Sequence, residues 1–257
     1  MRLLKQFIYG FFYLVFFGGI FWWIYSATLR PAPTCFDEKQ NQEETGIDCG
    51  GPCISCEVKN LKPLSIGGIT SLFGDDRIFS VAAEVKNPNA DYGTRNFSYE
   101  ADFYDSSSRL LGVEKGIDFI YPGENKYIIV AGIKIGNGIP VRAEIKLINQ
   151  SEIKWEKKND FIPLSAEFKN VLAELENNQV IISGYVINVN NFEFSRVVVS
   201  AFAIDNMGIK VGASKTETKI GPFGTWNFKI FIPVNKTLIK NIDLDATVKS
   251  AVVGVLK

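Results

Sequence analysis

The chain contains no histidine among its 257 residues. Histidine is the commonest general base, the commonest transition-metal ligand and the middle member of the usual nucleophilic triads. Its absence excludes most hydrolase mechanisms. The sequence also lacks G-x-S-x-G, H-E-x-x-H, phosphate-loop and dinucleotide-binding motifs. We therefore expect no catalytic residues and no required cofactor, and we interpret the chain as a non-enzymatic protein.

Net charge is absent too, because 28 Lys and Arg residues balance 28 Asp and Glu residues. A surface that binds nucleic acid normally presents clustered, unbalanced Lys and Arg to the phosphates. Nucleic acid is therefore not an expected partner. A length of 257 residues suits about two domains of ordinary size.

Charged residues are missing from Phe7 to Tyr25, a run of nineteen residues rich in Phe, Ile, Trp and Tyr. As a helix, this run nearly matches the ~30 Å hydrocarbon core of a bilayer. Trp22 and Trp23 gather with Tyr25 at its outer end, where aromatic rings prefer the headgroup level. The sequence predicts a single-pass membrane anchor, with the lipid bilayer as the partner of residues 7–25.

The orientation of this helix follows from the flanking charges. Arg2 and Lys5 precede the run, and Arg30 is the only basic residue just after it. The positive-inside rule then places the N-terminus in the cytoplasm and everything after about Ser26 outside. A cleaved signal peptide is the alternative, but its apolar region is normally ~7–15 residues long. Because Ser26-Ala27-Thr28 is also a poor cleavage site, we expect the helix to be retained.

Cysteine is confined to one segment of twenty-two residues, at positions Cys35, Cys49, Cys53 and Cys56. In an extracytoplasmic protein, an even number of closely spaced cysteines predicts two disulfides. Four cysteines allow three pairings, and the sequence does not choose among them. A zinc site is the competing interpretation, because Cys53-x-x-Cys56 has the spacing of a metal knuckle.

The cysteine segment is acidic, with Lys39 as its single base. Oxygen ligands in a small cross-linked loop are suited to Ca²⁺, and the best-placed candidates are Asp37, Asn41, Glu44 and Asp48. No EF-hand spacing is present. A solvated acidic face is therefore the alternative to a calcium site.

The pattern C-x-D-x-x-x-N-x-x-E-T-G-I-D-C-G-G-P-C-x-x-C, from Cys35 to Cys56, resembles a short cysteine module of bacterial surface and secreted proteins. The resemblance implies an extracytoplasmic setting and disulfides, and it names no activity. This chain departs from the module at Glu38, where a glycine usually follows the aspartate.

Beyond Cys56 the chain reads as short alternating strands between turn residues, and the clearest strand runs from Asn96 to Asp105. Two copies follow each other at an offset of about a hundred residues. The best matches are Asn87-Pro-Asn89 with Asn188-Val-Asn190 and Asp105 with Asp205. A period this long indicates two domains, and the strand density predicts two tandem Ig-like antiparallel β-sandwiches. The expected last strands are 141–147 and 242–248, and the expected junction lies within 159–165.

The second copy resembles the FxLYD family of small bacterial and archaeal surface domains. The residues that carry the resemblance are Val180-Ile-Ile-Ser-Gly-Tyr-Val-Ile-Asn188, Phe194-Ser-Arg-Val-Val-Val-Ser-Ala-Phe202 and Asp205-Asn-Met-Gly208. The first copy looks like a diverged relative that lacks the glycine after Asp105. The resemblance implies an Ig-like fold and an envelope location, and it brings no catalytic residues.

The predicted organisation is therefore a cytoplasmic tip and transmembrane helix (1–30), a proline linker and stapled acidic segment (31–57), and two sandwiches (58–162 and 163–257). We expect an extracytoplasmic binding or scaffold module of a prokaryotic cell envelope, with an envelope protein as its partner. A structural stalk is one alternative. A metal sensor that uses the acidic cysteine segment is the other.

Overall fold

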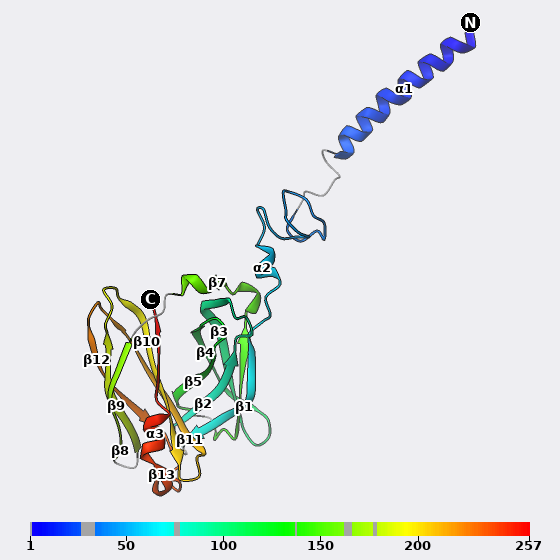
Figure 1. Ribbon diagram of the computed structural model, residues 1–257. Coiled ribbons are helices and arrows are strands. Elements are labelled where there is room, and N and C mark those ends of the chain that lie inside the picture. The colour runs from blue at the N-terminus through cyan, green and yellow to red at the C-terminus, as the bar shows by residue number, and fades with distance from the viewer. Residues whose placement is uncertain (1, 27–33, 75–77, 137, 162–165, 177–178) are drawn as a thin grey trace. The chain divides into compact units, whose positions relative to one another are not determined.

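The computed structural model describes residues 2–26, 34–74, 78–136, 138–161, 166–176 and 179–257 (Figure 1). The chain forms two compact units, which comprise residues 1–61 and 62–257. The predicted proline spacer (31–33) and most of the predicted junction (162–165) lie outside the described residues.

The first unit contains one long helix, α1 (Arg2–Ile24), as the apolar run predicts. Its stretch Lys5–Ile24 is long and apolar enough to cross a membrane, and none of that window is buried in the protein. Phe7 is 80% exposed, Trp22 71%, Trp23 70% and Tyr25 45%. A short helix, α2 (Cys56–Lys59), follows the cysteine segment, and Ser55 caps it by accepting a hydrogen bond from Val58 N.

The described residues of the second unit form four antiparallel sheets. In its first half, one sheet has the order β1-β2-β5, with β1 (Ser65–Gly74), β2 (Phe79–Lys86) and β5 (Asn125–Ile133). The other has the order β4-β3-β6, with β4 (Leu110–Ile120), β3 (Tyr92–Tyr104) and β6 (Arg142–Ile148). The short strand β7 (Glu156–Lys157) also pairs with β3, between two turns of 3-10 helix, η2 (Gln150–Glu152) and η3 (Lys158–Asp160).

The second half repeats this arrangement. One sheet has the order β8-β9-β12, with β8 (Ala166–Glu176), β9 (Gln179–Asn188) and β12 (Thr225–Ile232). In the other, β10 (Phe194–Asp205) pairs with β11 (Lys210–Ile220) on one side, and with β13 (Ile242–Asp243) and β14 (Val252–Leu256) on the other. Each half is thus a sandwich-like pair of sheets, and the strands of the second half pair in the same order as those of the first.

The apolar face predicted for residues 96–105 is confirmed within β3, whereas Asp102, expected on the solvent face, is buried. Phe97, Tyr99, Ala101 and Phe103 are all at most 4% exposed, and they pack in one apolar core with β2, β5 and β6. A second core fills the other half around Phe194, Phe228 and Ile230. Side chains of period two that meet between sheets are the usual core of a sandwich.

Equivalent side-chain hydrogen bonds stabilise the matching turn after the second strand of each half. Asn87 Nδ2 donates to the carbonyls of Tyr92 and Tyr121 at 2.7 and 2.8 Å, and its Oδ1 accepts from Asn89 N. Asn188 Nδ2 donates to three carbonyls in its own half, and its Oδ1 accepts from Asn190 N at 3.0 Å. Both amides are buried, at 3% and 0% exposure. In both halves, the first asparagine of the Asn-x-Asn motif is therefore a buried side chain that links backbone groups of neighbouring segments by hydrogen bonds.

The turn that follows each aspartate is also conserved between the copies. Asp105 Oδ1 accepts from the backbone N–H groups two and four residues later, and Asp205 Oδ1 does the same. Gly208 has a φ of 80° in the second copy. Ser108 occupies the matching place with a φ of 60°, so the first copy keeps the left-handed turn without the glycine.

The predicted last strand of the first copy is confirmed as β6, but the predicted strand over 242–248 is wrong. Only Ile242–Asp243 pairs as a strand, and a helix, α3 (Leu244–Lys249), follows a turn of 3-10 helix, η4 (Ile239–Asn241). Asp243 caps α3 by accepting from Ala246 N at 2.9 Å. The hydroxyls of Thr247 and Ser250 accept hydrogen bonds from Ile204 N and Phe202 N of β10. These side chains thus satisfy backbone groups of β10 that would otherwise pair with a neighbouring strand. The last strand is β14.

The two halves pack on each other through the outward faces of two sheets. Phe73, Ala82 and Ile129 from the first half form one apolar cluster with the following residues of the second: Phe202, Ile204 and Ala213. A second cluster joins Phe119 and Phe161 to Val198 and Leu256. As a result β2 and β10 are buried on both faces. The halves form one compact unit.

A polar contact closes this interface at its edge. Tyr121 Oη donates to Val255 O at 2.5 Å. Burial raises the pKa of Tyr121 to about 12, so the phenol keeps the proton that it donates.

Candidate functional site

The cysteine segment is the site that the sequence singled out, and two disulfides staple it. Cys35 is bonded to Cys53, and Cys49 to Cys56. All four cysteines are described and none is free. The prediction of two disulfides is confirmed, and the structure supplies the pairing that the sequence left open. Bonded sulfurs are not thiolates, so this pairing does not support the zinc interpretation.

Tight turns bring the cysteines together. Gly50 and Gly51 have φ values of 82° and 56°, and a Cβ on Gly50 would lie 2.0 Å from Thr45 Oγ1. Glu38 has a φ of 58°. It stands where the resembling module usually has glycine, the residue that adopts this conformation most easily.

Among the described residues, the carboxylates of Asp37, Glu44 and Asp48 do not gather into one group, and the predicted calcium ligands instead bond to donors of the chain. Asp48 Oδ1 accepts from the backbone N of Asp37 and of Glu38 at 2.9 and 3.0 Å. Glu44 Oε2 accepts from Asn41 N at 3.1 Å. Asn41 Nδ2, which is a donor, faces Asp37 Oδ2 at 2.8 Å. Their observed role is to satisfy the turns of a segment that has little apolar core.

The charges in this segment are partly compensated. Asp48 is 7% exposed and Glu44 is 6% exposed. Lys59 Nζ lies 3.5 Å from Asp48 Oδ2. The hydrogen bond from the Asn41 amide lowers the pKa of Asp37, together with backbone N–H groups and Lys39. These carboxylates are therefore acceptors within the fold, and their calcium role stays a prediction.

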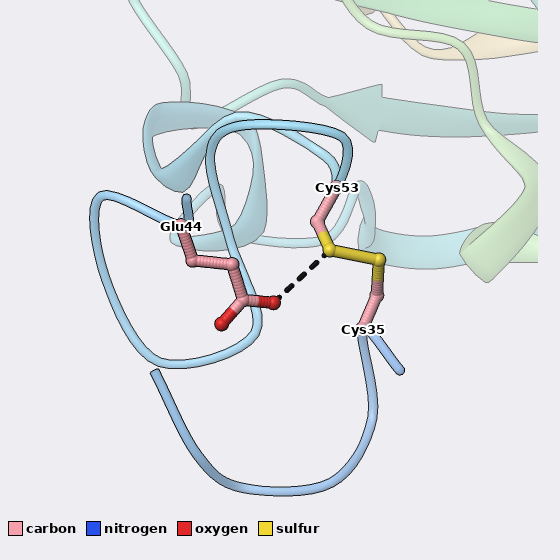
Figure 2. A group of neighbouring side chains, drawn as sticks. All are labelled: Cys35, Glu44 and Cys53. Carbon is pink, nitrogen blue, oxygen red and sulfur yellow. Dashed lines mark hydrogen bonds between the residues drawn. A yellow bond between two sulfur atoms is a disulfide. The ribbon is translucent and has the colours of Figure 1, made fainter. Parts of the chain in front are cut away.

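Glu44 also touches a disulfide. Figure 2 shows its Oε1 pointing at Cys53 Sγ, at 3.1 Å, with Cys35 on the other sulfur. A bonded sulfur carries no hydrogen, so this is a close S···O approach and not a thiol hydrogen bond. The three residues are the one group of clustered metal-ligand types within the described ranges. With the disulfide formed, Glu44 is the only one of the three that keeps an ordinary ligand atom.

The structure also holds a polar site that the sequence did not indicate. Asp118 is 2% exposed between the two halves, and Lys126 Nζ lies 3.0 Å from its Oδ1. Arg196, from the second half, approaches the same carboxylate at 3.8 Å. Seventy-eight residues separate Asp118 from Arg196, so no spacing in the sequence joins them. The sequence did contain a signal for the interface at which these residues meet. The near-continuous apolar run from Val197 to Ile204 indicates a strand that is covered on both faces.

Comparison with known proteins gives little further information. No family model matches the chain, and no curated protein matches it. Among solved structures, a red sea bream transglutaminase is similar at 12% identity with a TM-score of 0.25. The match covers 77% of this chain and 32% of the enzyme's chain. A likeness at this score carries no argument about function.

Proposed function

We propose that this chain is a non-enzymatic, membrane-anchored extracytoplasmic protein whose β unit is a binding or scaffold module of a cell envelope. The observation that carries the proposal is the order of its parts. An apolar helix with no buried residues precedes a segment held by two disulfides, and the β unit follows.

The exposed surface of α1 supports the anchor. Large apolar side chains such as Phe11, Leu14 and Phe21 are each at least 70% exposed. Leaving apolar area in water costs about 25 cal/mol per Å², and a hydrocarbon core removes that cost. Arg2 and Lys5 at the start of the helix favour a cytoplasmic N-terminus. The disulfides favour an oxidising compartment for the rest of the chain.

The strand order supports two Ig-like sandwiches. In each half, the fifth strand joins the sheet of the first two, and the third strand pairs with the fourth. Immunoglobulin-type sandwiches place strands A, B and E together and C and F together. The resemblances to the FxLYD family and to the short cysteine module point the same way. These resemblances imply a prokaryotic surface protein, and an envelope protein as its partner is part of our proposal.

A scaffold or binding module is favoured over a stalk. A spacer gains length when its domains are joined end to end, with small contacts between them. Here sheet faces of the two halves share buried clusters that include Phe202 and Phe119. A metal sensor is also less favoured, because Asp37, Glu44 and Asp48 already accept hydrogen bonds from the chain.

Charge placed in the middle of α1 should release the protein from membranes. Leu14→Arg with Phe16→Arg puts two guanidinium groups in the hydrocarbon region, at about 2.5 to 3.5 kcal/mol each. We expect the unaltered chain to stay in the pellet after alkaline carbonate extraction and the double variant to be largely soluble.

The matched control is Leu172→Arg with Phe231→Arg, which alters two exposed apolar residues of the β unit. This variant should stay in the pellet. Extraction of the unaltered chain, or a mature N-terminus beyond Ser26, would contradict the anchor.

Crosslinking of the full chain in intact cells distinguishes a binding or scaffold module from a spacer. A module should be recovered with a defined envelope protein, and a spacer should not.

A further inference from the structure

One face of the β10–β11 pair lies against the first half of the β unit, and its chemistry changes along its length. Phe202 and Ala213 belong to one apolar cluster, and Val198 belongs to the other. Ser200 and Lys215 are cross-strand partners between them. The interface therefore consists of two apolar contacts with a polar gap in the middle.

A cavity of about 230 Å³ lies at this gap. Strand β5 contributes Asn125, Lys126 and Tyr127 to its wall, and the second half contributes residues from β10, β11 and β14. Part of the wall is apolar, including the Phe202 ring and Val253. The rest is polar and includes the donors of Asn125, Ser200 and Lys215 as well as the carboxylates of Asp118 and Glu124. Pockets of this mixed kind, in which an apolar wall is combined with a few polar groups, are typical of sites for small organic ligands.

Most of the charged side chains around the cavity already have a partner, and the wall residue Glu124 accepts a hydrogen bond from Tyr121 N at 2.7 Å. Asp118 is paired with Lys126 at 3.0 Å, and Glu217 is paired with Arg196 at 2.8 Å. These four are the charges that act on Lys215. Within the described ranges, Lys215 Nζ itself makes no hydrogen bond or ion pair. It is a cation in the cavity wall with which no described carboxylate forms an ion pair.

Burial makes this arrangement unfavourable. It lowers the pKa of Lys215, and the nearby carboxylates of Asp118 and Glu217 offset the effect only in part. A partly buried ammonium is stable when it is paired with an anion. Among the described residues, the carboxylates of the wall are already engaged, Asp118 by Lys126 and Glu124 by Tyr121 N.

We propose that this cavity binds a small organic carboxylate, with its charged end on Lys215 and its apolar body against Tyr127, Phe202 and Val253. The Ser200 hydroxyl and the Asn125 amide lie in the same wall and supply further donors. The ligand would contact both halves of the β unit. This binding is independent of the membrane anchor and of the cysteine segment.

Equilibrium dialysis of the full chain in lipid nanodiscs tests the site, with binding to empty nanodiscs subtracted. The probe is phenylacetate, and its neutral isostere phenylacetamide is the ligand control. We expect phenylacetate to bind and the amide to bind at least about tenfold more weakly. Lys215→Met should weaken phenylacetate binding by about tenfold or more. Lys219→Met, which alters an exposed lysine of the same strand, should leave it unchanged.

A second measurement needs no variant. Phenylacetate should protect Lys215 of the unaltered chain from acylation by an amine-reactive ester, as read by mass spectrometry, while Lys219 is acylated at the same rate with and without it. The proposal is overturned if phenylacetate does not bind, or if it binds no better than the amide. It is also overturned if Lys215 gains no protection. A Lys215→Met variant that is more stable and binds phenylacetate equally well would also overturn the proposal, because Lys215 would then be a buried cation without a role in binding.

Discussion

Replacing Asn188 with alanine is expected to lower the free energy of unfolding of the β unit by about 3 kcal/mol. Its amide is fully buried and donates to the carbonyls of Phe192, Ile220 and Gly221 at 2.7, 3.3 and 3.0 Å. The alanine variant leaves those carbonyls without that donor in a buried place. Urea unfolding of the full chain in nanodiscs, followed by circular dichroism, measures the loss. Asn191→Ala, an exposed neighbour, should change it by less than about 0.5 kcal/mol.

The equivalent change in the first half tests whether the halves unfold together. Asn87→Ala removes the same kind of buried amide, with bonds to Tyr92 O and Tyr121 O. Because Phe202 and Ile204 pack against the first half, we expect a single transition that either variant shifts. Two separate transitions, of which each variant moves only one, would contradict a shared interface core.

Loss of the disulfides should unfold the cysteine segment and leave the β unit intact. By loop closure, the Cys35–Cys53 bridge spans 18 residues and contributes ~3 kcal/mol, while Cys49–Cys56 spans 7 and contributes ~2 kcal/mol. Among the described residues of the cysteine segment, only Glu44, Asp48 and Cys49 are buried. The segment therefore has no apolar core that could keep it folded without the disulfides. Hydrogen exchange of residues 35–57 should reach unprotected rates after reduction.

The paired variants rank the two bridges. Cys35→Ser with Cys53→Ser should loosen the segment more than Cys49→Ser with Cys56→Ser, because it opens the longer loop. The unfolding transition of the β unit should stay the same in both variants. Among the described residues, the four apolar clusters of the β unit contain no residue before Leu64, so none of them includes the cysteine segment. Protection that survives reduction would show that the segment folds without its disulfides.

The features that the sequence predicted well depend on local patterns. The uncharged run from Phe7 to Tyr25 gives α1, and the alternation from Phe97 to Phe103 gives the buried face of β3. Asn87 and Asn188 were matched as turn residues, and the structure places both in the same hydrogen-bonded role. Short-range periodicity and turn chemistry are sufficient for such features.

The features that the sequence did not predict depend on tertiary contacts. Residues 242–248 alternate like a strand, yet Asp243 caps a helix, and the hydroxyls of Thr247 in that helix and Ser250 just after it accept hydrogen bonds from β10. The disulfide pairing brings together cysteines of a segment in which Glu38 and Asp48 adopt left-handed backbone conformations, and residue spacing does not reveal these turns. Of the predicted calcium ligands, Asn41 presents its donor nitrogen to Asp37, an orientation that residue spacing does not reveal.

The interface between the halves was missed for a related reason. Ala82 and Phe202 lie on the outward faces of their sheets, and residues of the other half pack against both. A strand buried on both faces has no clear alternation, and β10 reads as an almost continuous apolar run. The polar gap at Ser200 and Lys215 has meaning only after the two halves have been brought together.

Thiol labelling in intact cells tests the placement of the chain most directly. A membrane-impermeant maleimide is added to cells that express the full chain, before and after treatment with an impermeant reductant. We predict no labelling at first, because all four cysteines are bonded, and labelling of all four from outside after reduction. Free thiols before reduction, or thiols that react only after the membrane is opened, would contradict a single crossing that delivers the β unit to the oxidising side.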